Sequence, residues 1–170
     1  MPQLERAGMI LDASHMAEQS FWDALELYRG TVIASHSNCR AYVNSDTDRQ
    51  LSDEMIRAIA NRNGVIGAVM YNRFIKAGWD KSARKEAVAL ADVVQHIWRV
   101  CDLAGDCNHA GIGSDFDGGF GVEAVPKEID TVADLQKLGD ALADARFDDE
   151  DIRNILGGNW IRMLRMALPE

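Results

Sequence analysis

The chain of 170 residues is 47% hydrophobic and 26% charged, which is typical of a globular domain and excludes a fibre or a disordered chain. Its formal charge of -9 argues against nucleic-acid and anionic-membrane partners, which need clustered Lys and Arg. Three cysteines without a Cys-x-x-Cys pair indicate neither a disulfide framework nor a thiolate zinc site. Because there is no leader-like segment and no apolar run of about 20 residues, we expect a cytoplasmic protein with one domain over residues 1–170.

The N-terminal region predicts the end of a helix, a strand, a second helix and a second strand, over residues 3–8, 9–13, 17–29 and 32–35. Both strands are short apolar runs, and a histidine follows each of them, His15 and His36. One strand and one helix separate these side chains. We therefore expect them at equivalent ends of neighbouring parallel strands.

The middle of the chain predicts a helix, a strand and a long loop. After a polar loop over residues 44–50, Ser52 can cap a helix whose first turn is acidic. Residues 65–70 are continuously apolar, as expected of a parallel strand that is covered on both faces. The loop over residues 71–84 is long for a compact domain, and such loops are often functional.

The second half predicts an amphipathic helix, a fourth strand over residues 110–114 and three terminal helices. The apolar positions of the amphipathic helix recur three or four residues apart, at Ala87, Leu90, Ala91, Val94, Ile97, Trp98 and Cys101. Thr131 and Asp148 each have an aspartate three positions later, which is the spacing of a capping box at a helix start. The last helix is expected over residues 160–166.

Strands that alternate with helices predict an α/β fold with a parallel sheet. An open doubly wound sheet and a (β/α)8 TIM barrel both fit this order. A complete barrel typically has about 250 residues. If the fold is a barrel, we expect the chain to form its C-terminal half, with about four βα units and the terminal helices.

Candidate functional groups lie at the C-terminal ends of the strands, where parallel α/β folds place their sites. These ends carry His15, His36, Tyr71 and Asp115. Two neutral imidazoles that bind Zn2+ and a carboxylate that accepts a proton from water are the parts of a hydrolytic zinc site. The pattern predicts such a site here. Two plainer interpretations stay open: a single histidine at a strand end is more often structural, and Asp115 in a glycine-rich segment can simply form a tight turn.

The remaining histidines and two arginines are interpreted from their positions. His109 precedes the fourth strand, at the opposite end from Asp115, and is expected to be a surface or packing residue. His96 lies off the apolar stripe of its helix and is expected to face solvent. Arg40 and Arg49 follow the second strand, where a guanidinium group can bind a substrate carboxylate or pair with a neighbouring acidic residue.

Four motifs resemble those of the membrane (renal) dipeptidase family of zinc peptidases, in the same order along the chain. They are ILDASH over residues 10–15, VIASHSNCR over 32–40, GIGSDFDG over 111–118 and GGNW over 157–160. The spacing of His15 and His36 also agrees with the family. The resemblance covers essentially the whole chain, and it implies an amidohydrolase-like TIM barrel that hydrolyses dipeptides with a binuclear zinc centre.

The resemblance also implies roles for individual residues. His15 and His36 fall on the two histidines that bind the second zinc ion, and Asp115 falls on the aspartate that acts as acid and base. Arg49 falls on the arginine that holds the C-terminal carboxylate of the substrate, with Arg40 as the fallback because the loop before Arg49 is longer than usual. Tyr71 is the further candidate for substrate binding.

Several ligands that the resemblance implies do not occur in this sequence: the family's His-x-Asp motif, a glutamate that bridges the two metals and a further active-site histidine. The chain has no His-x-Asp and no predicted strand before residue 9 to carry one. Two hypotheses follow. The chain is a C-terminal fragment of a zinc dipeptidase that is inactive alone, or it is a noncatalytic half-barrel that forms a homodimer or complements a separately encoded N-terminal half.

Overall fold

The computed structural model describes residues 2–43 and 48–168, so positions 44–47 of the predicted polar loop lie outside the described residues. Its strands are β1 (Leu11–Asp12), β2 (Val32–Ile33), β3 (Ile66–Ala68) and β4 (Ala110–Ile112). β1 pairs with β2 and β3 pairs with β4, and both pairs are parallel. A parallel bridge between Ala34 and Ile66 joins the two pairs, so the strands lie in sequence order. The parallel α/β architecture is confirmed, with strands shorter than predicted.

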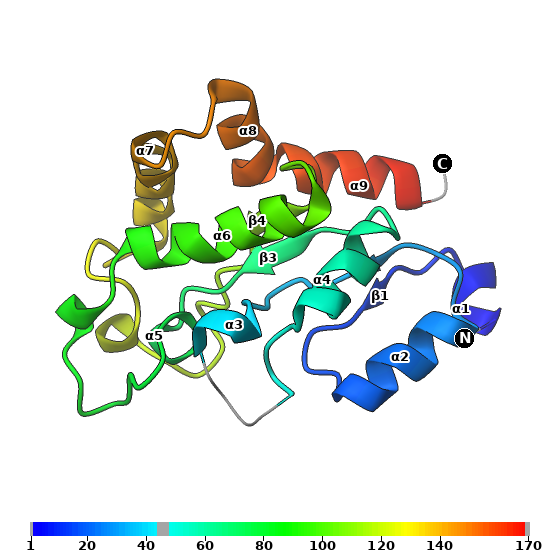
Figure 1. The fold of residues 1–170 in the computed structure, drawn as a ribbon, viewed down its shortest axis with the longest axis horizontal. Helices are drawn as coiled ribbons and strands as arrows, with labels where there is room; N and C mark the ends of the chain where they lie inside the picture. The colour runs from blue at the N-terminus through cyan, green and yellow to red at the C-terminus, as the bar shows by residue number, and fades with distance from the viewer. Residues whose placement is uncertain (1, 44–47, 169–170) are drawn as a thin grey trace.

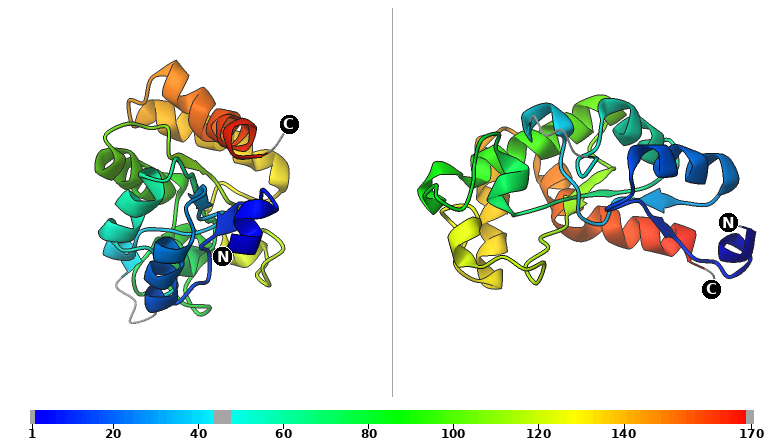
Figure 2. Two further views of the ribbon diagram at one scale, coloured as in Figure 1. Left: turned by 90° about the vertical axis from the view of Figure 1, so that its right-hand side faces the viewer. Right: turned by 90° about the horizontal axis from the view of Figure 1, so that it is seen from below.

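Helices join successive strands and cover the sheet (Figure 1). α2 (Glu18–Leu27) follows β1, α4 (Asp53–Ala60) follows β2, and α6 (Leu90–Ala104) connects β3 to β4. In the end-on view of Figure 2 the helices lie on two sides of the strands. The other helices are α1 (Pro2–Arg6), α3 (Arg40–Val43), α5 (Asn72–Ile75), α7 (Lys137–Asp144), α8 (Asp149–Arg153) and α9 (Asn159–Ala167). Short helical turns cover Lys85–Ala87, Val122–Ala124, Val132–Gln136 and Asn154–Gly158.

The helix starts follow the predicted caps. The Ser52 hydroxyl accepts the backbone N–H of Met55 at 3.3 Å, so α4 begins where its first amide groups are satisfied. Asp148 accepts two backbone N–H groups in the same way at the start of α8. Asp134 accepts from the backbone N–H of Thr131 at 2.8 Å, which fixes the helical turn that leads into α7. All three predicted caps are confirmed.

The predicted buried face of α6 needs correction. His96 is 2% exposed, and Trp98, which was expected to be buried, is 51% exposed. Val93 and Val100 are buried, so the buried face is rotated towards His96. The cause is a polar partner at each ring nitrogen of His96: Nδ1 accepts the backbone N–H of Cys39 at 3.0 Å, and Nε2 donates to the carbonyl of Ile75 at 2.9 Å. A buried polar side chain is stable when both its nitrogens are bonded.

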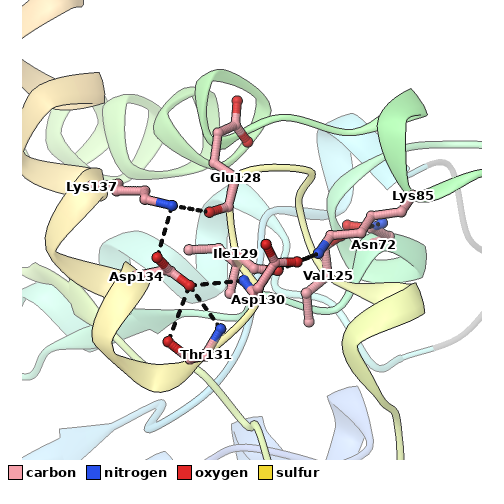
Figure 3. Close-up of polar contacts among 9 residues, drawn as sticks. All are labelled: Asn72, Lys85, Val125, Glu128, Ile129, Asp130, Thr131, Asp134 and Lys137. Atoms are coloured by element: carbon pink, nitrogen blue, oxygen red, sulfur yellow. Dashed lines mark hydrogen bonds and ion pairs between the residues drawn. The ribbon is translucent and has the colours of Figure 1, made fainter.

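The segment between β4 and α7 is held by a polar network (Figure 3). Asp134 binds Lys137 Nζ at 2.7 Å and accepts the backbone N–H of Asp130 at 3.0 Å. Lys85 reaches Asp130 Oδ1 at 2.7 Å, and Asn72 Nδ2 donates to the carbonyl of Val125 at 3.0 Å. These contacts tie the segment that begins with Asp115 to the parts of the chain next to α5 and α6.

Within residues 2–43 and 48–168, no helix has the length and apolarity needed to cross a membrane. Cys39, Cys101 and Cys107 are free thiols, as expected. The expectation of a cytoplasmic location stays a prediction.

Candidate metal and substrate site

His15 and His36 meet beyond the ends of β1 and β2. Their Nε2 atoms are 2.9 Å apart, and their ring centroids are 5.0 Å apart with the ring planes tilted by 55°. The parallel register, which places Asp12 opposite Ile33, brings the two strand ends level. His15 has a left-handed backbone with φ of 66°, which turns the chain sharply after β1. The structure therefore brings the two sequence-predicted ligands together.

A carboxylate and two hydroxyl groups support His36. Asp12 Oδ1 accepts the backbone N–H groups of Ser14 and Ser35, both at 3.0 Å. Ser35 Oγ lies 2.5 Å from Asp12 Oδ2 and 2.7 Å from His36 Nδ1. Ser14 Oγ accepts the backbone N–H of His36 at 3.1 Å. Burial raises the pKa of Asp12, but the hydrogen bonds from Ser35 and Ser14 outweigh it, and the net pKa lies below its usual value.

The donor pair fits a zinc ion as two of its ligands. Two nitrogens that bind one tetrahedral Zn2+ at about 2.0–2.1 Å stand about 3.3 Å apart, close to the observed separation of 2.9 Å between the two Nε2 atoms. In the part of the chain that the structure describes, no three or more His, Cys, Asp or Glu side chains gather to complete such a site.

The ionisation of His15 suits metal binding. Burial lowers its pKa, and the neighbouring side chains of Arg49 and His36 lower it further, while Asp115 and Asp12 act in the opposite direction. The net shift is downward, so the imidazole stays neutral at pH 7 and keeps a lone pair.

Asp115 forms a turn and also acts on the site. Its φ is 58°, and its carbonyl accepts the N–H of Gly118 at 2.8 Å, so the plain turn interpretation is correct. A Cβ atom at position 118 would lie 2.4 Å from Asp115 Oδ1, which explains a glycine there. Its carboxylate also opposes the lowering of the pKa values of His15 and Arg49 by burial. The turn thus places a negative charge where it acts on His15.

The two candidate arginines have different surroundings. Arg49 donates to the carbonyl of His36 at 2.9 Å and to Ser37 Oγ at 3.1 Å, and its guanidinium carbon lies 4.7 Å from the centroid of the Phe74 ring. Burial lowers the pKa of Arg49, and the carboxylates of Asp115 and Asp12 partly offset this. Arg40 instead pairs with Glu18 at 2.7 Å. Arg49 is the cation beside the histidine pair.

A comparison with protein families agrees with this geometry. Residues 1–168 match the family described as membrane dipeptidase, peptidase family M19. The chain belongs to this M19 family. The predicted resemblance is confirmed.

Relatives of this M19 chain are longer than it is. An uncharacterized protein encoded in the pqqA 5' region of Klebsiella pneumoniae is 32% identical over 163 residues, which are 96% of this chain and 56% of that protein. The solved structure of dipeptidase AC, a metallopeptidase of family M19, is 28% identical with a TM-score of 0.86, and the match covers 98% of this chain and 46% of that one. A Rhodobacter sphaeroides metallopeptidase, solved with a phosphinate mimic of the dipeptide L-Ala-D-Ala, is 28% identical with a TM-score of 0.84 over 98% of this chain and 44% of its own. The chain spans about half the length of these relatives.

In this M19 chain Tyr71 belongs to an aromatic cluster. Its ring stacks on Phe120 with centroids 4.6 Å apart and planes within 12°, and it meets Phe74 edge to face at 4.9 Å. Phe120 follows the Asp115 turn, and Phe74 lies beneath Arg49. The cluster therefore connects the ends of β3 and β4 beside the site. Neither phenylalanine was predicted from the sequence, although aromatic residues in two loops at strand ends are a usable signal.

Asn38 is a third residue that was not predicted from the sequence. It is buried, and its side chain bonds the backbone of Val69 through both amide atoms and donates to the carbonyl of Phe74 at 2.9 Å. It thereby fixes the loop after His36 against the end of β3. Its place two residues after a candidate ligand was the available clue. His109 donates from Nδ1 to the carbonyl of Gly64 at 2.8 Å, which fits the packing role expected for it.

Proposed function

We propose that this chain contributes part of the active site of a zinc-dependent dipeptidase. The observation that carries the proposal is the Nε2–Nε2 distance of 2.9 Å between His15 and His36 at adjacent strand ends, in a chain of the M19 family. A Zn2+ ion would be held by these two imidazoles and by ligands outside the described residues. When bound, zinc makes water nucleophilic at neutral pH and polarises the peptide carbonyl.

The chain's own residues would divide the remaining tasks. Asp115 would accept a proton from the attacking water and deliver it to the amine that leaves. The family resemblance implies this role, and the electrostatic effect of its carboxylate on His15 supports its placement beside the site. Arg49 would orient the C-terminal carboxylate of a dipeptide, since a guanidinium group suits carboxylate geometry. Tyr71 and its stacked partner Phe120 would line the substrate space next to Arg49.

We further propose that a complete enzyme requires sequence outside residues 1–170, on the same chain or on a separate one. Two observations support this. This chain covers only 46% and 44% of the two solved M19 structures, and the described residues bring together only two candidate zinc ligands, His15 and His36. In this proposal the described strands form one half of a TIM barrel, and the missing half supplies the His-x-Asp motif and the bridging glutamate that the family resemblance implies.

The direct test is hydrolysis of L-Ala-D-Ala and L-Ala-L-Ala with added Zn2+. We expect negligible turnover by residues 1–170 alone. We expect turnover when the chain is coexpressed with the sequence encoded immediately upstream, and its loss in the His36→Ala variant. Strong turnover by the isolated chain that His36→Ala abolishes would contradict the requirement for added sequence. A zinc-loaded complete assembly without dipeptidase activity would contradict the function itself.

A second candidate function is a noncatalytic half-barrel that associates with a second copy. Exposed apolar side chains favour it, among them Leu27, Ile161 and Met166. It predicts that the isolated chain forms a stable oligomer. It also predicts that this oligomer does not hydrolyse dipeptides, whether or not it binds zinc.

The carboxylate-binding role can be tested in the complete enzyme. Arg49→Met is expected to raise KM for dipeptides by about 10–100-fold, because a charge-assisted hydrogen bond contributes about 1.5–3 kcal/mol. Arg40→Met should leave KM unchanged, and a rise in KM there instead would assign the role to Arg40. Arg165→Met, which removes an exposed charge on α9, is the matched control.

A further inference from the structure

The carboxylate of Asp12 links the two strand ends that carry the histidine pair. Oδ1 accepts one backbone N–H from each side, from Ser14 after β1 and from Ser35 after β2, and both distances are 3.0 Å. Oδ2 is left for the Ser35 hydroxyl at 2.5 Å. The carboxylate is therefore bonded to both turns that lead into His15 and His36.

The proton of the Ser35 hydroxyl can be assigned from these contacts. Oγ has two close neighbours, the Asp12 carboxylate at 2.5 Å and His36 Nδ1 at 2.7 Å, and a longer contact of 3.4 Å with Ser14 Oγ. An ionised carboxylate can only accept a hydrogen bond, and a hydroxyl has one proton to donate. The bond to Asp12 is charge-assisted and the shorter of the two, so the proton lies there. Oγ then accepts, and His36 Nδ1 must carry the hydrogen of the second bond.

We propose that Asp12 and Ser35 are positioning residues that fix His36 as its Nδ1–H tautomer and so present the lone pair of Nε2 as the metal-binding atom. The relay runs from His36 Nδ1–H to Ser35 Oγ and from the Ser35 hydroxyl to Asp12. Partners of this kind set the tautomer and ring orientation of metal-binding histidines. The inference rests on the proposed function for the identity of the metal, whereas the tautomer is a property of the metal-free chain.

The same geometry assigns His15 the opposite tautomer when no metal is bound. His36 Nε2 faces His15 Nε2 at 2.9 Å, and two lone pairs would repel at that distance. The hydrogen between the rings therefore belongs to His15 Nε2. His36 is the preset ligand of the pair, and His15 must transfer its hydrogen to Nδ1 before both nitrogens can bind one ion.

The test is 15N NMR of the histidine rings in the full chain, freed of metal with a chelator and held above pH 7.5. Resonances are assigned with His15→Gln and His36→Gln. We expect a protonated Nδ1 and a bare Nε2 in His36, with the reverse pattern in His15. A protonated Nε2 in His36 would overturn the proposal.

Three serine variants separate the relay from general packing. Ser35→Ala should lose the fixed tautomer of His36 and weaken Zn2+ binding, measured by calorimetry, by about 10–100-fold. Ser35→Thr keeps a hydroxyl and should restore both readouts. Ser14→Ala removes the acceptor of the His36 backbone N–H and the 3.4 Å contact between Ser14 Oγ and Ser35 Oγ, but it keeps the bonds that join Asp12, Ser35 and His36, so the tautomer should persist.

The proposal can still be decided if a variant does not fold or if the complete enzyme is inactive. If Ser35→Ala keeps the His36 tautomer, the relay is wrong. If Ser35→Ala does not fold, the Ser35→Thr spectrum decides, because a protonated His36 Nε2 in that variant would also overturn the proposal. If the tautomers are as expected and the zinc-loaded complete enzyme has no dipeptidase activity, the relay stands and the proposed function fails.

Discussion

His96 is a buried imidazole with both ring nitrogens in use, one accepting from Cys39 and one donating to Ile75. Burial lowers its pKa to about 4, although the Ile75 carbonyl and Asp92 act in the opposite direction. The ring is therefore neutral in the folded protein at pH 7. It joins the loop after His36 to α5 and α6, so a single residue outside the site determines where part of the site lies.

This shifted pKa predicts that stability falls in acid. Between pH 6.5 and about 4 the unfolded chain protonates His96 while the folded chain does not, so the free energy of unfolding should drop by about 3 kcal/mol as the pH falls through that window. Denaturant unfolding of the chain and of His96→Gln at pH 7 and pH 4.5 checks this. The variant should be less stable at pH 7 and lose less on acidification. His109→Gln is the control, and an equal loss in the chain and in His96→Gln would contradict the prediction.

Three strands approach unusually closely next to the site. Cβ atoms added at Gly67 and Gly113 would lie 2.1 Å and 2.0 Å from the backbone oxygen of Ser35. Backbone cannot yield as a flexible side chain can, so both positions need glycine. Because Ser35 precedes His36, this close contact also fixes the position of the backbone that carries His36, just after β2.

Gly113→Ala is therefore expected to lower the free energy of unfolding by more than about 2 kcal/mol, since the backbone at Ser35 and at Gly113 must move apart. Gly139→Ala in α7 is the matched control, because its new Cβ would meet nothing closer than 3.5 Å. There a helix-favouring alanine should stabilise by up to about 1 kcal/mol. Thermal unfolding of both variants measures the difference. A Gly113→Ala variant that is as stable as the wild-type chain would refute the packing argument.

The elements differ in how far their sequence determines them. The strands, the caps at Ser52 and Asp148, and the histidines at the strand ends follow from local patterns, and these could be predicted. The orientation of α6 could not be predicted, because His96 is buried by partners on α5 and on the loop after β2, far away in sequence. The Asp12 relay was equally hidden, since it depends on the register between β1 and β2.

The molecule as a whole exposes apolar side chains. Its relatives are about twice as long, so they have additional sequence that can cover such a surface. Ile161, Leu164 and Leu168 are 52%, 42% and 48% exposed, and they recur three or four residues apart along α9 and just beyond it. β1 and β4 each have one edge to which no other named strand is paired among the described residues. Exposed apolar stripes and free strand edges both favour association.

We therefore expect the isolated chain to dimerise or aggregate. Sedimentation velocity over a range of concentrations measures this, and a single monomeric species at high concentration would contradict the expectation. A double change, Ile161→Glu with Leu164→Glu, should weaken association if α9 contributes to it. Coexpression with the sequence that the proposed complete enzyme requires should have the same effect in the wild-type chain.

The sequence order of the strands has a consequence for synthesis. Each strand bonds to the strand made immediately before it, so every pairing can close as soon as the next βα unit has been made, without waiting for distant chain. Loop closure between near neighbours costs less conformational entropy than closure across a whole barrel. We expect β2 and β3 to be protected from protease in nascent chains that are stalled on the ribosome after α6 and β4 have emerged, before α9 is translated. Such stepwise growth would leave one edge of β1 and one edge of β4 unpaired among the described residues, and Asp12 of the histidine site belongs to β1.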